Sequence, residues 1–167
     1  MADYWNQGTV SPCLPLDNDV LEALGLHSED IVHNEEEGQY EGSTAAEVIF
    51  ASWLNSWDGR DDDCVGTCLN YTAEATRSGF IPHIYYLYFE EYLDDFSVHV
   101  LQQILKKMAP ASVPHIVVEY ANTCSKMRQD GFGGGAIIIT RDKIHRMNTS
   151  QWVDETLERL KKAKGEE

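Results

Sequence analysis

Basic residues are almost missing from the first hundred residues of this chain. That part holds 20 Asp and Glu side chains but only two cations, Arg60 and Arg77, so its formal net charge is −18, whereas residues 101–167 carry +3. A surface that binds phosphates needs clustered Lys and Arg, which argues against direct nucleic-acid binding by this part. This uneven distribution of charge gives information about how the protein associates with other molecules and not about its fold. We therefore expect a basic protein partner.

Long apolar runs and an export signal are also lacking. No apolar stretch approaches the roughly 20 residues that span a bilayer, and the N-terminus does not place basic residues before apolar ones. The four cysteines, Cys13, Cys64, Cys68 and Cys124, do not have the spacing of a disulfide framework. We expect a cytoplasmic protein with reduced thiols that does not bind a membrane.

Apolar residues are nevertheless abundant enough for a core. They make up 43% of the sequence, and aromatic residues make up 10%, which is too much for a disordered chain. A length of 167 residues suits one domain. We expect a single domain over residues 1–167, with an acidic part of mainly helix and loop in 1–80, an α+β core in 81–163 and a tail in 164–167.

Capping residues ahead of apolar side chains at helical spacing predict two helices. Thr44 and Glu47 form a capping box before apolar residues that continue to Trp57. Asp94 and Asp95 precede the second helix, which ends before Pro110. Weaker patterns predict three further helices, near residues 17–26, over 64–76 and from about 150 onward.

Three strands are predicted in the second half of the chain, over His83–Glu91, His115–Ala121 and Ala136–Thr140. The first is so dense in aromatic and aliphatic residues that both of its faces should be largely covered. Residues 1–16 are expected to form an extended arm, and residues 28–42 a solvated loop. The β-α-β-β-α order in residues 82–163 predicts an α+β fold: a small sheet with helices packed on one face, covered by the N-terminal helical and loop region.

A glycine run is the most unusual local feature. Gly133, Gly134 and Gly135 could let backbone N–H groups approach a phosphate, with Lys126 and Arg128 supplying charge. The run leads into a strand, whereas phosphate loops lead from a strand into a helix. A hairpin connection or a bulge at the strand entrance is the favoured alternative.

A carboxylate cluster raises the possibility of a metal-dependent hydrolase or of a general acid and base pair. Glu90, Glu91, Asp94 and Asp95 stand at the end of a strand, and His99 follows one turn into the next helix. Carboxylates in this position also serve as helix caps, which is the favoured interpretation.

Two other acidic or thiol patterns have simpler explanations. Cys64 and Cys68 would share a helix face, but the second ligand pair of a zinc site is missing, which favours buried thiols. The acidic run at residues 58–63 lacks the glycine and the final glutamate of a calcium-binding EF-hand loop, which favours a solvated turn. We expect no resident metal and no cofactor.

No motif for nucleophilic catalysis is present, so we favour a protein that is not an enzyme. The first hypothesis is an acidic binding or inhibitory protein that docks on a basic partner. It could imitate the phosphate array of DNA, as anti-restriction and anti-CRISPR proteins do. The residues expected to bind the partner are Glu35, Glu36, Glu37, Asp58, Asp61, Asp62 and Asp63. The alternatives are a metal-dependent hydrolase or nucleotide-processing enzyme built on the carboxylate cluster and the glycine run, and a structural subunit of a homo-oligomer.

Overall fold

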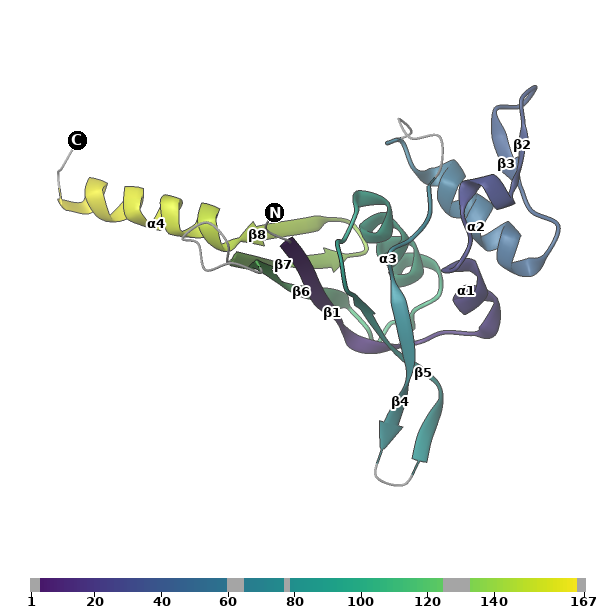
Figure 1. Cartoon of the computed structure of the whole chain (residues 1–167), viewed down its shortest axis with the longest axis horizontal. Coiled ribbons are helices and arrows are strands. Elements are labelled where there is room, and N and C mark those ends of the chain that lie inside the picture. The colour runs from purple at the N-terminus through teal and green to yellow at the C-terminus, as the bar shows by residue number, and fades with distance from the viewer. Residues whose placement is uncertain (1–3, 60–64, 77–78, 125–132, 165–167) are drawn as a thin grey trace.

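The computed structural model describes residues 4–59, 65–76, 79–124 and 133–164 (Figure 1). Its main feature is a six-stranded antiparallel sheet with the strand order β4-β5-β1-β6-β7-β8. The strands are β1 (Tyr4–Pro15), β4 (Asn70–Thr76), β5 (Gly79–Phe89), β6 (His115–Cys124), β7 (Gly133–Thr140) and β8 (Ile144–Asn148). The predicted α+β class is confirmed.

The helices and a small hairpin complete the described chain. They are α1 (Asn18–Ala23), the 3-10 turn η1 (Ser28–Asp30), α2 (Ala45–Ser56), α3 (Asp95–Lys107) and α4 (Thr149–Lys164), with the hairpin strands β2 (Val32–Asn34) and β3 (Gln39–Glu41). Within the part of the chain that the structure describes, no helix has the length and apolar character needed to cross a membrane.

One face of the sheet is covered by α3, and the core lies between them. The sheet contributes Val118 and Ile139, and α3 contributes Leu101 and Ile104, all of which are fully buried. Phe96, at the start of α3, joins this core to α2, since its ring lies 5.8 Å from that of Phe50. The sheet therefore has one packed face and one face that no helix of the described residues covers.

The segment 17–59, which we call the acidic lobe, folds as α1, η1, the β2–β3 hairpin and α2. Its helices begin as expected: Asp17 accepts a hydrogen bond from the Val20 amide, and Thr44 forms the predicted capping box with Glu47. The hairpin is held against α2 by Asn55, whose side chain both donates to the Tyr40 carbonyl and accepts from the Tyr40 amide, at 2.8 and 2.9 Å.

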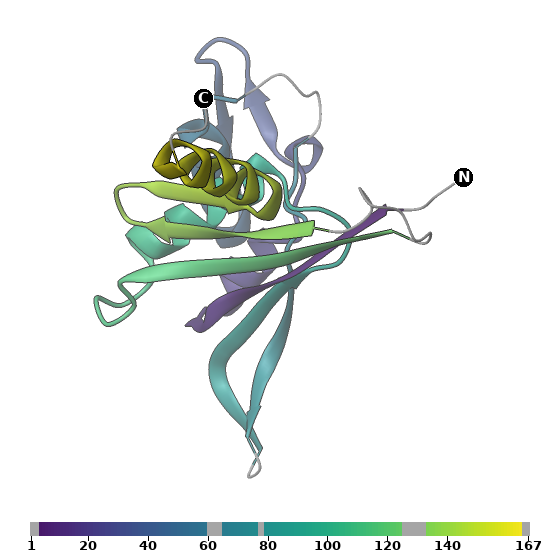
Figure 2. The same ribbon diagram turned by 90° about the vertical axis from the view of Figure 1, so that its left-hand side faces the viewer.

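Three sequence-based expectations are corrected, and one strand was not predicted. Residues 4–15 are not an arm but a strand between β5 and β6, and residues 70–76, expected to be helical, form the edge strand β4. The expected loop at 28–42 contains the β2–β3 hairpin, and β8 was not foreseen. Figure 2 shows β1 lying across the middle of the sheet and the β4–β5 hairpin extending below it. Because strands form by pairing between distant segments, local patterns predicted them poorly.

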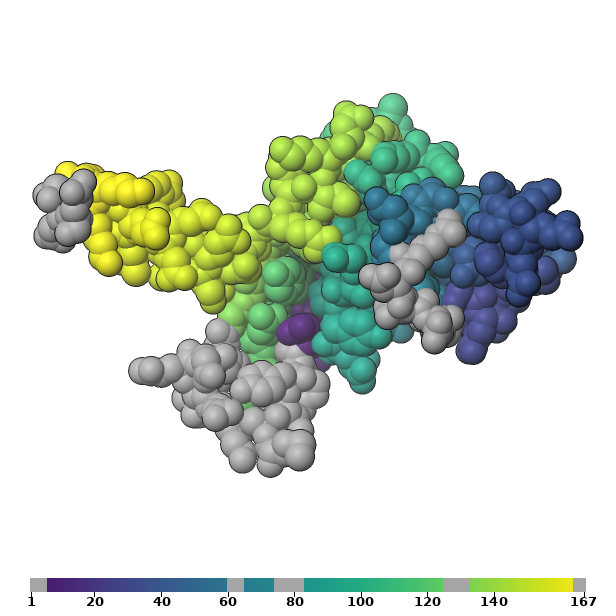
Figure 3. All heavy atoms as spheres, turned by 90° about the horizontal axis from the view of Figure 1, so that it is seen from above, coloured from purple at the N-terminus to yellow at the C-terminus, as the bar shows by residue number. Residues whose placement is uncertain are grey.

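The last helix also differs from the expected packing. α4 follows β8 directly and extends away from the sheet, as Figures 1 and 3 show. Only Thr156 is partly buried among the α4 residues from Thr149 to Ala163, and the others are exposed. Of the helices predicted in the second half of the chain, α3 covers the sheet and α4 does not.

Candidate functional site

Two members of the predicted carboxylate cluster, Asp94 and Asp95, have structural contacts. Glu90 and Glu91 follow β5 and are exposed. Asp94 is the N-cap of α3, and its Oδ1 accepts a 2.6 Å hydrogen bond from the Ser97 amide. Asp95 Oδ1 accepts a 2.7 Å bond from Arg146 on β8 and forms an ion pair with it. The contact of Asp94 fits the favoured interpretation of these carboxylates as helix caps, whereas the ion pair of Asp95 was not predicted.

His99 faces α2 rather than the carboxylates. Its Nε2 lies 3.0 Å from Ser56 Oγ, and its ring stacks near Phe96 with centroids 6.4 Å apart. Burial lowers the pKa of the His99 imidazole, and nearby Lys106 acts in the same direction. Within the described ranges, no group of three or more His, Cys, Asp or Glu residues is arranged to hold a metal ion.

Cys68 is half-buried beside the start of α3. Its Sγ lies 3.4 Å from Ser97 Oγ, and its backbone amide donates to the same oxygen at 2.9 Å. Burial raises the pKa of the Cys68 thiol above its ordinary value, which disfavours the thiolate. Its proposed partner, Cys64, lies outside the described residues.

The glycine run forms a strand instead of a phosphate loop. Gly133, Gly134 and Gly135 begin β7 and are paired with β6, and Gly135 also pairs with β8. A Cβ on Gly134 would collide with the Tyr120 carbonyl oxygen, and one on Gly135 would meet the Tyr120 hydroxyl oxygen at 2.6 Å. Close approach to neighbouring atoms therefore accounts for these two glycines. The two cations assigned to this site, Lys126 and Arg128, lie outside the described residues.

The acidic lobe carries eleven carboxylates and no Lys or Arg. They are Asp17, Asp19, Glu22, Glu29, Asp30, Glu35, Glu36, Glu37, Glu41, Glu47 and Asp58. The turn of the hairpin holds Glu35, Glu36 and Glu37, and the Asn34 side chain fixes it by accepting from two of their amides. Asp58 follows α2, close enough to His99 to act electrostatically on its pKa. The predicted residues Asp61, Asp62 and Asp63 lie outside the described residues.

Ion pairs do not neutralise this lobe within the described structure. In the described part of the chain, the one ion pair joins Arg146 and Asp95, both outside the lobe. The lobe therefore presents a negative field to solvent.

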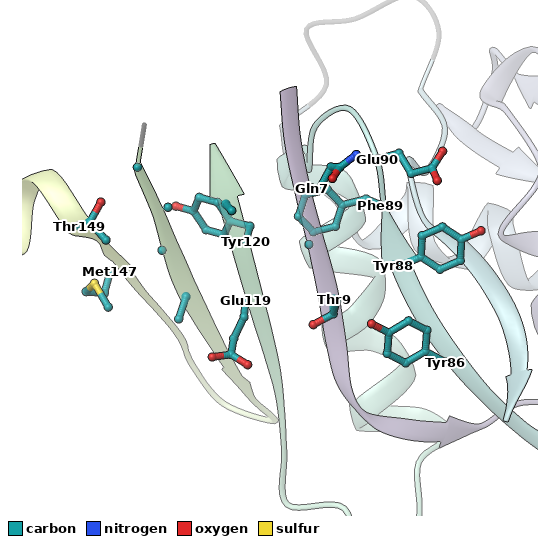
Figure 4. A pocket seen from close by; sticks show the side chains of 16 residues that line it. Gln7, Thr9, Tyr86, Tyr88, Phe89, Glu90, Glu119, Tyr120, Met147 and Thr149 are labelled. Carbon is teal, nitrogen blue, oxygen red and sulfur yellow. The ribbon is translucent and has the colours of Figure 1, made fainter. Parts of the chain in front are cut away.

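A groove on the uncovered face of the sheet is a site that the sequence did not reveal. Its volume is about 830 Å³. Strand pairing aligns Tyr88, Thr9, Glu119, Ala136 and Met147 in one row across five strands, so their side chains share this face. Figure 4 labels four of them, Tyr88, Thr9, Glu119 and Met147, together with neighbouring side chains. We call it the sheet groove and define it by Thr9, Tyr86, Tyr88, Glu90, Glu119 and Met147.

The sheet groove combines aromatic rings with carboxylates. Tyr86 and Tyr88 stack with ring centroids 6.2 Å apart and planes inclined by 22°. Glu119 lies across β1 from Tyr88, and Glu90 lies at the end of β5. Neither Lys nor Arg occurs among the described residues that line the groove. Aromatic faces and carboxylates both attract ammonium and guanidinium groups, so this chemistry favours a cationic ligand.

An alternation in the sequence of β5 could have indicated this groove. Leu87 and Phe89 are buried in the core, whereas Tyr86 and Tyr88 are only partly buried on the opposite face. The expectation that both faces of this strand would be largely covered is therefore wrong for the groove side. Glu119 gave no such signal, because its position opposite Tyr88 depends on where β1 pairs.

Comparison of the chain with known protein families, with curated proteins and with solved structures gives no match.

Proposed function

We propose that this chain is a non-enzymatic binding protein that docks on a basic protein partner. The observation that carries the proposal is the sheet groove, in which Tyr86 and Tyr88 share one face with two carboxylates. Glu90 follows the same strand, Glu119 lies on the far side of β1, and the described lining holds no Lys or Arg. A Lys or Arg side chain entering the groove would lie over a tyrosine ring and meet a carboxylate. Each such contact contributes about 0.5–2 kcal/mol, depending on how far it is desolvated.

The acidic lobe has a second role in this proposal. Its eleven carboxylates act at long range, because charges of one sign without Lys or Arg among them raise the rate at which a basic partner arrives. The lobe thus accelerates association, and the groove holds selected side chains. Added salt should slow association strongly, since the Debye length falls from about 10 Å at 0.1 M to about 3 Å at 1 M.

A basic protein that itself binds DNA or RNA is the partner class that fits this charge best. Its binding surface is built for an array of phosphates, and the carboxylates of the lobe offer an array of the same sign. Docking there would make this chain an inhibitor that competes with nucleic acid. We therefore expect duplex DNA to compete with this chain for binding to the partner.

A labelled peptide with alternating Arg and Leu residues tests the groove, and a peptide with Glu in place of Arg is the control ligand. The variant Glu119→Lys should weaken binding of the Arg peptide at least tenfold, measured by fluorescence anisotropy. The matched variant is Asp142→Lys, which makes the same charge change at an exposed site outside the groove. Equal binding by the two variants would show that net charge alone drives the association and would remove the groove from the proposal.

A further inference from the structure

An apolar stripe on α4 lacks a covering element in the described chain. Trp152, Val153, Leu157 and Leu160 are exposed by 54%, 43%, 51% and 54%. At 100° per residue these side chains lie on one side of the helix, together with Thr156, and the charged residues occupy the rest of the surface. We call these five residues the α4 stripe.

The chain itself does not cover the stripe in the described structure. Contacts of α4 are chiefly with β7 and β8, next to its first residue. The helix then extends into solvent, as Figure 3 shows. A helix of 16 residues is marginally stable on its own, and in proteins such a helix is held by packing of its apolar face. A contiguous apolar surface of this kind marks an interaction site.

The charges beside the stripe identify the partner. Asp154 and Glu155 lie in the first half of α4, whereas Arg159 and Lys161 lie in the second half. On the helix surface, Glu155 and Arg159 fall on one flank of the stripe, and Asp154 and Lys161 fall on the other. Each flank therefore carries a carboxylate in the first half of the helix and a cation in the second half.

We propose that the stripe is covered by α4 of a second copy of this chain, running antiparallel and centred on Leu157. In this register Glu155 lies beside Arg159 of the partner subunit, and Asp154 lies beside Lys161 of the partner subunit. A parallel two-fold pair would bring opposite flanks together, which places Glu155 beside the partner's Asp154 and Arg159 beside the partner's Lys161. The antiparallel pair alone combines burial of the stripe with opposite charges on both flanks.

The guanidinium of Arg159 is not committed to a carboxylate within its own helix. It donates from Nε to the Glu155 carbonyl oxygen at 3.3 Å and from Nη2 to Thr156 Oγ1 at 3.0 Å. The Glu155 carboxylate accepts from Gln151 Nε2 at 2.7 Å. Both groups are exposed at the flank and have further hydrogen-bonding capacity for the second copy.

The contact is closed by a two-fold axis through Leu157, so it forms a dimer and no larger assembly. Two 16-residue helices, each about 24 Å long, bury less surface than a standard interface of about 1,600 Å². The equilibrium between monomer and dimer should therefore be visible at micromolar concentrations. The sheet groove takes no part in this contact, so this inference stands apart from the proposed function.

Sedimentation equilibrium of the full chain, at low and high micromolar concentrations, tests the dimer. We expect the average mass to rise from 18.9 kDa toward twice that value. Leu157→Asp should keep the monomer mass at every concentration. It should leave the circular dichroism of the rest of the fold intact, because Leu157 is exposed. Val32→Asp, at a side chain that is 64% exposed on the hairpin, is the matched control and should dimerise normally.

Charge reversal tests the register. Glu155→Arg should weaken the dimer about tenfold, because it places arginine beside arginine, and the double variant Glu155→Arg/Arg159→Glu should restore it. A parallel pair would not be weakened by the single reversal. A wild-type chain that stays monomeric, a dimer that survives Leu157→Asp, or a dimer indifferent to Glu155→Arg would each overturn the proposal.

Discussion

The imidazole of His99 on α3 is joined to the hydroxyl of Ser56 at the end of α2, with 3.0 Å between Nε2 and Oγ. The contact links the acidic lobe to the helix that covers the sheet. It also places a half-buried, ionisable group at the junction of the two, which makes the stability of this junction depend on pH.

Stability should fall as the pH drops through the ordinary histidine range, because burial lowers the pKa of His99 in the folded state. The unfolded chain, with a histidine pKa of about 6.5, takes up the proton first, so acid favours unfolding. The replacement His99→Gln should remove the contribution of this histidine to the pH dependence of stability. Urea unfolding at pH 8 and pH 5 should show a smaller pH-dependent loss of stability for the variant than for the wild type.

Ser56→Ala is the control for this prediction, since it removes the hydrogen-bond partner but keeps the titrating ring. The loss of stability between pH 8 and pH 5 should be the same for this variant as for the wild type. If the stability of the wild type and of His99→Gln depended equally on pH, His99 would not be the group that causes the loss of stability in acid.

Asp94 and Asp95 should differ in their importance for stability although they are adjacent. Asp94→Ala removes the N-cap of α3 and should cost about 1 kcal/mol in urea unfolding. Asp95→Ala removes an ion pair whose side chains are 50% and 76% exposed, and should change stability by less than about 0.5 kcal/mol. Asp94→Asn should retain most of the stability, because asparagine also caps. Similar losses for both alanine variants would argue against the capping role.

The glycines of β7 should tolerate alanine unequally. Gly135→Ala would bring a methyl group against the Met147 carbonyl oxygen and the Tyr120 ring, and should cost about 1–3 kcal/mol. Gly133→Ala meets nothing closer than 3.5 Å and should change stability by less than about 0.5 kcal/mol. Thermal unfolding of the two variants side by side measures the difference, and equal melting temperatures would contradict the close approach.

The Cys68 thiol should react slowly with iodoacetamide at pH 8. Burial raises its pKa, so less thiolate is present than in an exposed cysteine, and access is restricted as well. Mass spectrometry of the native chain and of the chain in urea should show faster labelling of Cys68 after unfolding. A native rate equal to the unfolded rate would exclude the burial that the structure shows.

Helices with local signals were predicted well from the sequence. The capping box of Thr44 and Glu47 placed α2 correctly, and the aspartates at 94 and 95 placed the start of α3. Both signals lie within one helical turn, so no distant residue is needed to recognise them.

Strands whose stability depends on distant partners were missed. β1 contains Pro12 and Pro15, which disfavour a central strand. Its pairing with β6 ends at Ser11, before both prolines, and its register with β5 shifts between Val10 and Leu14. β4 is polar and forms because β5 lies beside it. The sheet groove was missed for the same reason, since only the pairing of β1 with both β5 and β6 aligns Tyr88 and Glu119 on one face.

The position of β1 also determines when the sheet can be completed during synthesis. β1 leaves the ribosome before both of its neighbours, β5 and β6, and Tyr4 pairs with Cys124. Pairs so far apart in the chain give a high contact order, and proteins of this kind fold in milliseconds to seconds. Until about residue 124 has emerged, β1 cannot pair with β6. During this time its unpaired backbone groups can form hydrogen bonds with strands of other chains. β1 is thus made before both of its partners and is fully paired only after the second of them, β6, has been made.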